Sequence, residues 1–209
     1  RRAGAPPSPG SAVASGGGGG VVGAPPANGG AGAVSVVAPD GGPWQEVAKL
    51  APSELGARAT FGWALAYHDG TLAVGAPGAA TVVLYTRGAD GWVEQQRRAP
   101  DSAAGFGGSL ALRGDELLVG AARSGTAFRY RRGADGWTLA GRIVPPAGAD
   151  RATFGTALAI GPNAIAVGAP NAVGGRGRVW VYPGRGAGVG APSEVAPGRG
   201  PATHASGET

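Results

Sequence analysis

The chain has 209 residues, of which 43 are glycine and 18 are proline, and it contains no cysteine. The lack of cysteine excludes disulfides and thiolate metal sites, and no apolar run approaches the 18 or more residues of a membrane span. The net charge of +5 is compatible with nucleic-acid binding, but Lys49 is the only lysine and the arginines are scattered, so we expect no nucleic-acid partner and no membrane span.

A short sequence pattern recurs along the chain with nearly constant spacing. Phe-Gly occurs at residues 61–62, 106–107 and 154–155. Thirteen residues after each of these glycines stands the Gly of a Gly-Ala-Pro or near match, namely Gly75, Gly120 and Gly168. A degenerate first copy has Pro9-Gly10 in place of Phe-Gly, followed at the same offset by Gly23. A period of this length is typical of repeat architectures, which build a fold from stacked units.

The alignment of these copies predicts four units preceded by a short segment. We expect a linker or the end of a preceding unit at 1–8, a degenerate unit at 9–60, units at 61–105 and 106–153, and a unit with a Gly/Pro-rich end at 154–209. Because Thr209 stands where a further Phe-Gly would follow, we expect the array to continue beyond it.

Each unit is predicted to form four short strands and few helices. In the second unit the predicted strands are residues 63–67, 71–75, 81–86 and 92–97, separated by glycine-containing turns. The third strand is apolar on both faces and must be covered on both sides, while the fourth is polar, as suits an exposed edge. Four-stranded units at this spacing predict an all-β fold of β-propeller blades.

Three tryptophans recur at one position of the units, near the start of the predicted fourth strand. They are Trp44, Trp92 and Trp137. We expect them to pack at the rim of the blades, and the alternative is a platform on which sugar rings stack.

The chain resembles, over essentially residues 9–209, the FG-GAP repeat family, whose repeat builds the N-terminal propeller of integrin α subunits and occurs in many bacterial surface proteins. The resemblance rests on Phe61-Gly62, Leu65-Ala66, the run 72–77 and Gly91-Trp92, and it is closest to the bacterial short-loop type. It implies a partial propeller from a larger, about seven-bladed one, with closure of four blades as the alternative. It also implies an extracellular or cell-surface location, and a protein or glycan partner besides the remaining blades of the propeller.

Calcium, which some members of this family bind between the first two strands, is not expected here. The corresponding loops hold at most one carboxylate each, whereas calcium takes six to eight oxygen ligands. We therefore predict no cofactor and no metal.

Catalysis is not expected either. His68 and His204 have no evident nucleophile or carboxylate partner in the sequence, Ser109 has no nucleophile-elbow context, and the glycine run 16–20 lacks the rest of a phosphate-binding loop. Arg113-Gly114-Asp115 spells a tripeptide that integrins recognise on their ligands, but its place in the unit predicts an ordinary hairpin turn.

The loops between the second and third strands, together with the connections between units, are predicted to carry the partner site. The candidate residues are Asp101, Arg123, Asp150, Asn171, Arg176 and Arg178. The alternative is that these are solubilising charges without a ligand. We expect a non-catalytic interaction or adhesion module of a secreted or cell-surface bacterial protein, or alternatively an appendage of a secreted enzyme whose catalytic domain lies elsewhere.

Overall fold

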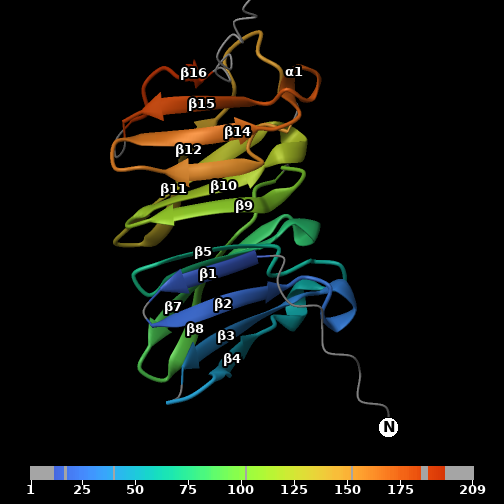
Figure 1. The fold of residues 1–209 in the computed structure, drawn as a ribbon, viewed down its shortest axis with the longest axis vertical. Coiled ribbons are helices and arrows are strands. Elements are labelled where there is room, and N and C mark those ends of the chain that lie inside the picture. Colours follow the sequence, from blue (N-terminus) through green and yellow to red (C-terminus); the bar gives the residue numbers. More distant parts are fainter. Residues whose placement is uncertain are drawn as a thin grey trace, which may run out of the picture.

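The computed structural model describes residues 12–16, 18–39, 41–101, 103–151, 153–184 and 188–195. Within these residues sixteen strands form four antiparallel sheets of four strands each, and each sheet follows the order of the chain (Figure 1). The all-β prediction of propeller blades is therefore confirmed. The predicted segment 1–8, Pro9-Gly10, His204 and most of the Gly/Pro-rich end lie outside the described residues.

We number the sheets as blades in chain order. The first blade contains β1 (Ala12–Gly16), β2 (Gly19–Ala24), β3 (Ala33–Pro39) and β4 (Trp44–Leu50). The second contains β5 (Ala64–His68), β6 (Thr71–Ala76), β7 (Thr81–Gly88) and β8 (Gly91–Arg98). The third contains β9 (Phe106–Arg113), β10 (Glu116–Ala121), β11 (Thr126–Gly133) and β12 (Gly136–Ile143). The fourth contains β13 (Ala157–Ile160), β14 (Ala164–Ala169), β15 (Arg178–Pro183) and β16 (Ser193–Val195).

Local sequence explains the strand pattern within a blade. In the second blade the apolar run 82–85 of β7 is buried throughout, while residues 94–96 of the polar β8 remain largely exposed. The two strands are joined by a tight turn at Gly91, whose φ of 121° suits glycine. A register shift interrupts the pairing of the third and fourth strands between Leu84 and Tyr85, and the first and third blades have a shift at the same place.

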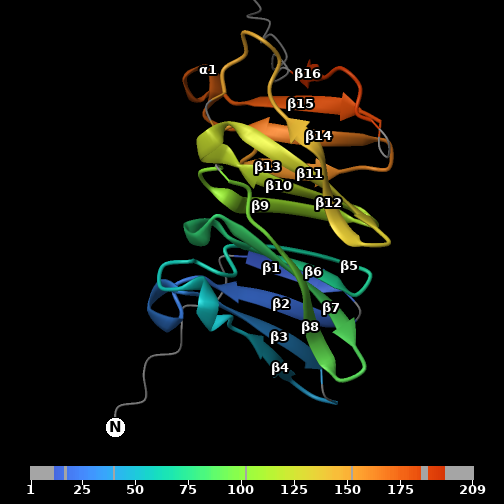
Figure 2. The ribbon, with the colours of Figure 1, turned by 180° about the vertical axis from the view of Figure 1, so that it is seen from behind.

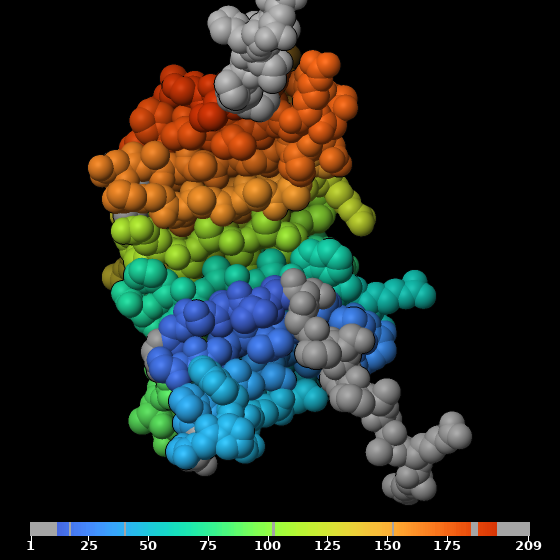
Figure 3. All heavy atoms as spheres, viewed as in Figure 1, coloured from blue at the N-terminus to red at the C-terminus, as the bar shows by residue number. Residues whose placement is uncertain are grey.

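The blades lie side by side around a common line formed by their first strands. Extensive packing joins β1 to β5, β5 to β9 and β9 to β13. Front and rear views show the first and second blades in the lower part of the molecule and the third and fourth blades in the upper part (Figures 1 and 2). The space-filling view shows the blue atoms of the first blade toward one end of the long axis and the orange and red atoms of the fourth blade toward the other (Figure 3). Closure of the array by the first and fourth blades is not seen among the described residues.

The recurrent pattern is explained by contacts between neighbouring blades. A Cβ atom added to Gly75 would lie 2.0 Å from the carbonyl oxygen of Gly107, so only glycine permits this approach. Gly107 itself has a φ of 86°. The same close approach is found at the two other interfaces. A Cβ atom added to Gly23 would lie 2.0 Å from the Gly62 carbonyl oxygen, and one added to Gly120 would lie 2.1 Å from the Gly155 carbonyl oxygen. Thus the Gly-Ala-Pro glycine of one blade receives the Phe-Gly glycine of the next.

The phenylalanine of each Phe-Gly fills the space between blades. Phe106 is fully buried and makes edge contacts with Phe128 and Tyr130, at ring-centroid distances of 5.2 and 6.3 Å. Its cluster includes Val82 and Leu84 of the preceding blade. The hydrophobic core is therefore distributed among the interfaces, and no blade has a core of its own.

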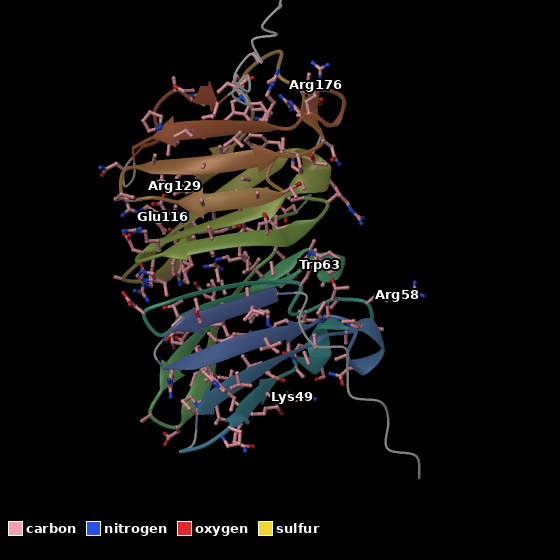
Figure 4. All side chains as sticks on the ribbon, in the orientation of Figure 1. Lys49, Arg58, Trp63, Glu116, Arg129 and Arg176 are labelled. Atoms are coloured by element: carbon pink, nitrogen blue, oxygen red, sulfur yellow. The ribbon has the colours of Figure 1, made fainter. Side chains whose placement is uncertain are left out.

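A buried ion pair lies in the third blade. The Arg129 guanidinium donates to the Glu116 carboxylate, and the two side chains are 5% and 1% exposed (Figure 4). Thr71 and Leu84 occupy the equivalent strand positions in the second blade. The second blade therefore has no charged side chain at either of these positions.

The three recurring tryptophans are more buried where a neighbouring blade packs against them, which supports the interpretation that they are packing residues. The Trp137 side chain is buried, with 3% of the residue exposed. Its backbone N–H donates to Gln96 Oε1 at 2.7 Å, and its backbone carbonyl accepts from Arg98 Nε at 2.9 Å. Trp92 is half-buried and meets Tyr67 edge-on. Trp44 is 60% exposed, because no described blade precedes the first.

Candidate interaction site

The loops between second and third strands and the connections between blades gather at one end of the molecule, which we call the loop face. It contains η1 (Asn28–Gly30), η3 (Pro77–Ala79), η4 (Ala122–Ser124) and α1 (Ala172–Gly175), together with the connections 51–63, 99–105 and 144–156. Arg58, Trp63 and Arg176 project at this end of the blades (Figure 4). At the opposite end, the second and third blades have tight hairpin turns between β5 and β6, β7 and β8, β9 and β10, and β11 and β12. The loop face is therefore the more varied surface.

A pocket of about 320 Å³ opens on the loop face between the second, third and fourth blades. Its lining includes Trp63, Gly108 and Thr156, which are the residues that follow Phe-Gly in three successive units. Trp63 is 49% exposed, and the small residues at the other two positions leave room beside its ring. Arg123 from η4 also lines the pocket.

Backbone contacts hold the pocket in shape. The N–H of Trp63 lies 3.1 Å from the Thr60 carbonyl and 3.2 Å from the Gly75 carbonyl, and donates to both. The Thr60 hydroxyl accepts from the N–H of Gly78 at 3.1 Å, which joins the entry to the blade with its own loop. Thr153 makes the equivalent contact in the fourth blade, where its hydroxyl accepts from the N–H of Asn171 at 3.0 Å. The residues around the pocket are thus held in place by hydrogen bonds of the residues that flank Phe-Gly.

The charge of the loop face is positive. Four exposed arginines take part in no ion pair between described residues, and these are Arg58, Arg123, Arg151 and Arg176. The Glu54 carboxylate already forms an ion pair with Arg97, and Glu94 forms a second ion pair with the same guanidinium. Glu94 and Glu54 together raise the pKa of Arg97. Asp101 and Asp150 are the remaining acidic side chains of the connections that form this face. An anionic group would therefore be attracted here.

The predicted site residues occupy different places. Arg123 lines the pocket beside Trp63, and Asp101 is exposed in the turn after β8. The Asp150 carboxylate accepts from the N–H of Val173 at 2.8 Å, so this aspartate shapes the α1 loop.

Asn171 and Arg176, also in this loop, are exposed. Arg178 is engaged by Glu194 at 2.6 Å and lies on the outer side of the fourth blade. The structure therefore brings Arg123 to the pocket but does not bring Arg178 there.

Trp63 was not among the residues predicted from the sequence. The available signal was its position: where the other units have Gly108 and Thr156 after Phe-Gly, the second unit has a tryptophan. Arg58 and Arg151, each three residues before the phenylalanine of its unit, were also missed.

The residues considered for catalysis have structural partners. The His68 imidazole accepts from the N–H of Gly114 at 3.2 Å, and the Asp115 carboxylate is paired with Arg131. The Arg-Gly-Asp tripeptide is therefore part of a hairpin held between blades. Ser109 donates to the Gly155 carbonyl at 2.6 Å, across the interface of the third and fourth blades.

The part of the chain that the structure describes contains no group of three or more His, Cys, Asp or Glu side chains that could hold a metal ion. No helix in it is long and apolar enough to span a membrane.

Comparison with known families identifies the repeat. The family profile described as "FG-GAP repeat" matches residues 44–89, which begin in β4 and end just after β7. Residues 44–89 therefore form an FG-GAP repeat. No curated protein sequence matches the chain.

Solved structures show the same architecture. The chain is similar to Sqt1 from Chaetomium thermophilum, with a TM-score of 0.59 and 11% identity over 82% of this chain and 42% of that one. Similarity to Saccharomyces cerevisiae Sqt1 has a TM-score of 0.47 and 17% identity over 64% of this chain and 34% of that one. The chain thus spans less than half the length of either protein. At this identity the first comparison supports the propeller fold alone.

Proposed function

We propose that this FG-GAP chain is a non-catalytic interaction or adhesion module of a secreted or cell-surface bacterial protein, and that it binds an anionic protein or glycan through the loop face. The observation that carries the proposal is the pocket in which an exposed tryptophan stands beside an arginine without an ion-pair partner among the described residues. A rigid scaffold that presents a shaped, charged loop surface is a common basis for binding.

The chemistry of the pocket favours a ligand with two features. The ring face of Trp63 offers a flat apolar surface for a sugar ring or an apolar side chain. The guanidinium of Arg123 offers a planar set of donors that matches a carboxylate. A uronic-acid sugar and an acidic peptide segment both combine these features, and the pocket volume of about 320 Å³ accommodates a group of this size.

The proposal is tested by measuring binding of the immobilised chain to a panel of acidic polysaccharides and extracellular proteins by biolayer interferometry. We expect at least one ligand whose affinity falls by about tenfold or more in both Trp63→Ala and Arg123→Glu. The matched control is Arg87→Glu, which makes the same change of charge at a hairpin turn of the opposite end. Equal losses in R123E and R87E would refute a site on the loop face, because they would indicate attraction by net charge alone.

The proposal extends to cofactors and location. We propose that the module works without calcium, because its first hairpin turns carry too few carboxylates. Calorimetric titration that detects stoichiometric, tight calcium binding would contradict this. For the location, protease treatment of intact cells of the source organism should remove the protein if it is exposed at the surface.

A further inference from the structure

Two exposed arginines lie beside the loops that form the Trp63 pocket. Residues of η3 and η4 both line this pocket. Arg58 precedes the second blade, and its backbone packs so closely on η3 that its carbonyl oxygen leaves no room for a side chain at Gly78. Arg151 precedes the fourth blade and packs beside the end of η4, where a Cβ added to Gly125 would lie 3.0 Å from the Arg151 Cβ. The backbones of both arginines are therefore fixed next to the pocket.

Positive charge thus recurs from blade to blade across the loop face. Arg58 stands at the entry to the second blade, Arg123 in the loop of the third, and Arg151 at the entry to the fourth. All three are exposed and take part in no ion pair between described residues. Figure 4 shows that Arg176, after the α1 loop of the fourth blade, projects at the same end as Arg58 and Trp63. Such a surface is complementary to a ligand whose negative charge also recurs along its length.

We propose that the loop face binds a linear polyuronate, which is a polysaccharide with a carboxylate on successive sugar rings. One ring stacks on Trp63 with its carboxylate on Arg123, and carboxylates further along the same chain pair with Arg58 and Arg151. This inference rests on the proposed function, because it uses the same pocket. It extends that function from a single bound group to a ligand that crosses three blades.

The form of the pocket favours a sugar ring over an acidic peptide. Trp63 is 49% exposed, and its neighbours Gly108 and Thr156 are small, so the pocket is an open shelf beside the indole ring. An exposed aromatic face suits the apolar face of a sugar ring, whereas a peptide is anchored by side chains that fill enclosed pockets. A polyuronate also carries a carboxylate on every ring, so its charges can reach the arginines without a particular sequence, and each can accept two hydrogen bonds from a guanidinium.

The ligand class is tested by isothermal titration calorimetry of the 209-residue chain. The probes are galacturonic acid, its oligomers of increasing length, and poly-L-glutamate as a carboxylate polymer without sugar rings. We expect the affinity to rise with oligomer length and then to level off, once the chain reaches the outer arginines. Poly-L-glutamate should bind at least about tenfold more weakly than a polygalacturonate of similar charge, because it has no ring to stack on the tryptophan.

Substitutions separate the outer contacts from the pocket. Arg58→Glu and Arg151→Glu should each lower the affinity of the longest oligomer by about tenfold or more, but change that of the shortest oligomer that binds by less than about threefold. Trp63→Ala should weaken the binding of both. Arg87→Glu, at a hairpin turn of the opposite end, is the matched control and should leave both affinities nearly unchanged.

Three results would overturn the inference. One is an equal effect of R58E and R151E on short and long oligomers, and another is an affinity that does not increase with length. The third is poly-L-glutamate binding as tightly as polygalacturonate, because the occupant would then be an acidic peptide. In each case the proposed function stands if binding still requires Trp63 and Arg123. Binding that is unchanged in both W63A and R123E would overturn the proposed function itself.

Discussion

Gly75 offers the most direct test of how neighbouring blades pack. Alanine at this position would place its Cβ 2.0 Å from the Gly107 carbonyl oxygen, whereas real Cβ atoms essentially never come within 3.0 Å of another heavy atom. The third blade must therefore retreat by about 1 Å or more. Gly75 does not have a positive φ, so strain of its own backbone does not contribute. The substitution tests the approach of two backbones alone.

The expected loss follows from two opposing terms. Overpacking costs about 1–3 kcal/mol, and the upper part of this range applies because the obstructing atom belongs to the backbone and cannot rotate away. Alanine also reduces the conformational entropy of the unfolded chain, which favours folding by about 0.4–1 kcal/mol. We therefore expect Gly75→Ala to lower the free energy of unfolding by about 2 kcal/mol.

The assay is urea unfolding followed by tryptophan fluorescence and far-ultraviolet circular dichroism. Gly168→Ala is the matched control, since it makes the same change at the equivalent position, where the nearest atom is the Cβ of Ala157 at 3.1 Å. We expect the control to change the free energy of unfolding by less than about 0.5 kcal/mol. Equal effects of G75A and G168A would refute the assignment of Gly75 to an interface that needs glycine.

Three further outcomes are expected. Glu116→Gln should lower the free energy of unfolding by about 3 kcal/mol, because it removes the carboxylate that pairs with the buried Arg129. The double variant E116T/R129L should recover most of this loss, and a double variant as unstable as E116Q would contradict the reasoning. In the same assay Trp137→Ala should lower the free energy of unfolding by about 3–5 kcal/mol, because Trp137 is buried, and Trp44→Ala should lower it by less than about 1 kcal/mol, because Trp44 is exposed. Similar losses in the two variants would argue against inter-blade packing as the role of Trp137. Burial raises the pKa of Tyr182 to about 12 and also raises the pKa of Tyr85 and of Tyr130, so the neutral phenols favour the folded state. Stability should therefore fall as the pH rises above about 10, and Tyr182 alone should account for roughly 2–3 kcal/mol of the loss by pH 12; an unfolding midpoint unchanged at pH 11 would refute this.

The fold was readable from the sequence because each blade is encoded locally. Glycine-containing turns, alternating burial and the polar fourth strand predicted strands whose ends agree with the second blade to within two residues. The buried Glu116–Arg129 pair was not predicted, since nothing in the sequence pattern distinguishes two charges on adjacent strands from an exposed pair. Burial at that place is decided by the neighbouring blade and not by the strand itself.

The loop face was predicted only in outline. The unit spacing correctly placed Arg123 among its loops, but the pocket depends on three residues from three blades that converge after Phe-Gly. Trp63 appears from the sequence alone to be one more aromatic residue at the start of a strand. Its exposure follows from Gly108 and Thr156 being small, which is a property of the assembled blades. The ion pair of Arg178 with Glu194 could not be predicted for a related reason, since it depends on the fold of the fourth blade.

The two halves of the FG-GAP pattern act in different interfaces, and this explains how the first copy has changed. Gly23, the Gly-Ala-Pro glycine of the first unit, still packs against Gly62 of the second blade, and any larger residue at position 23 would clash with the Gly62 carbonyl oxygen. The Phe-Gly position of the first unit has Pro9 instead of phenylalanine, and the first blade has no preceding neighbour among the described residues. Gly23 is thus required by a contact that the structure shows, namely the close approach of the Gly62 carbonyl.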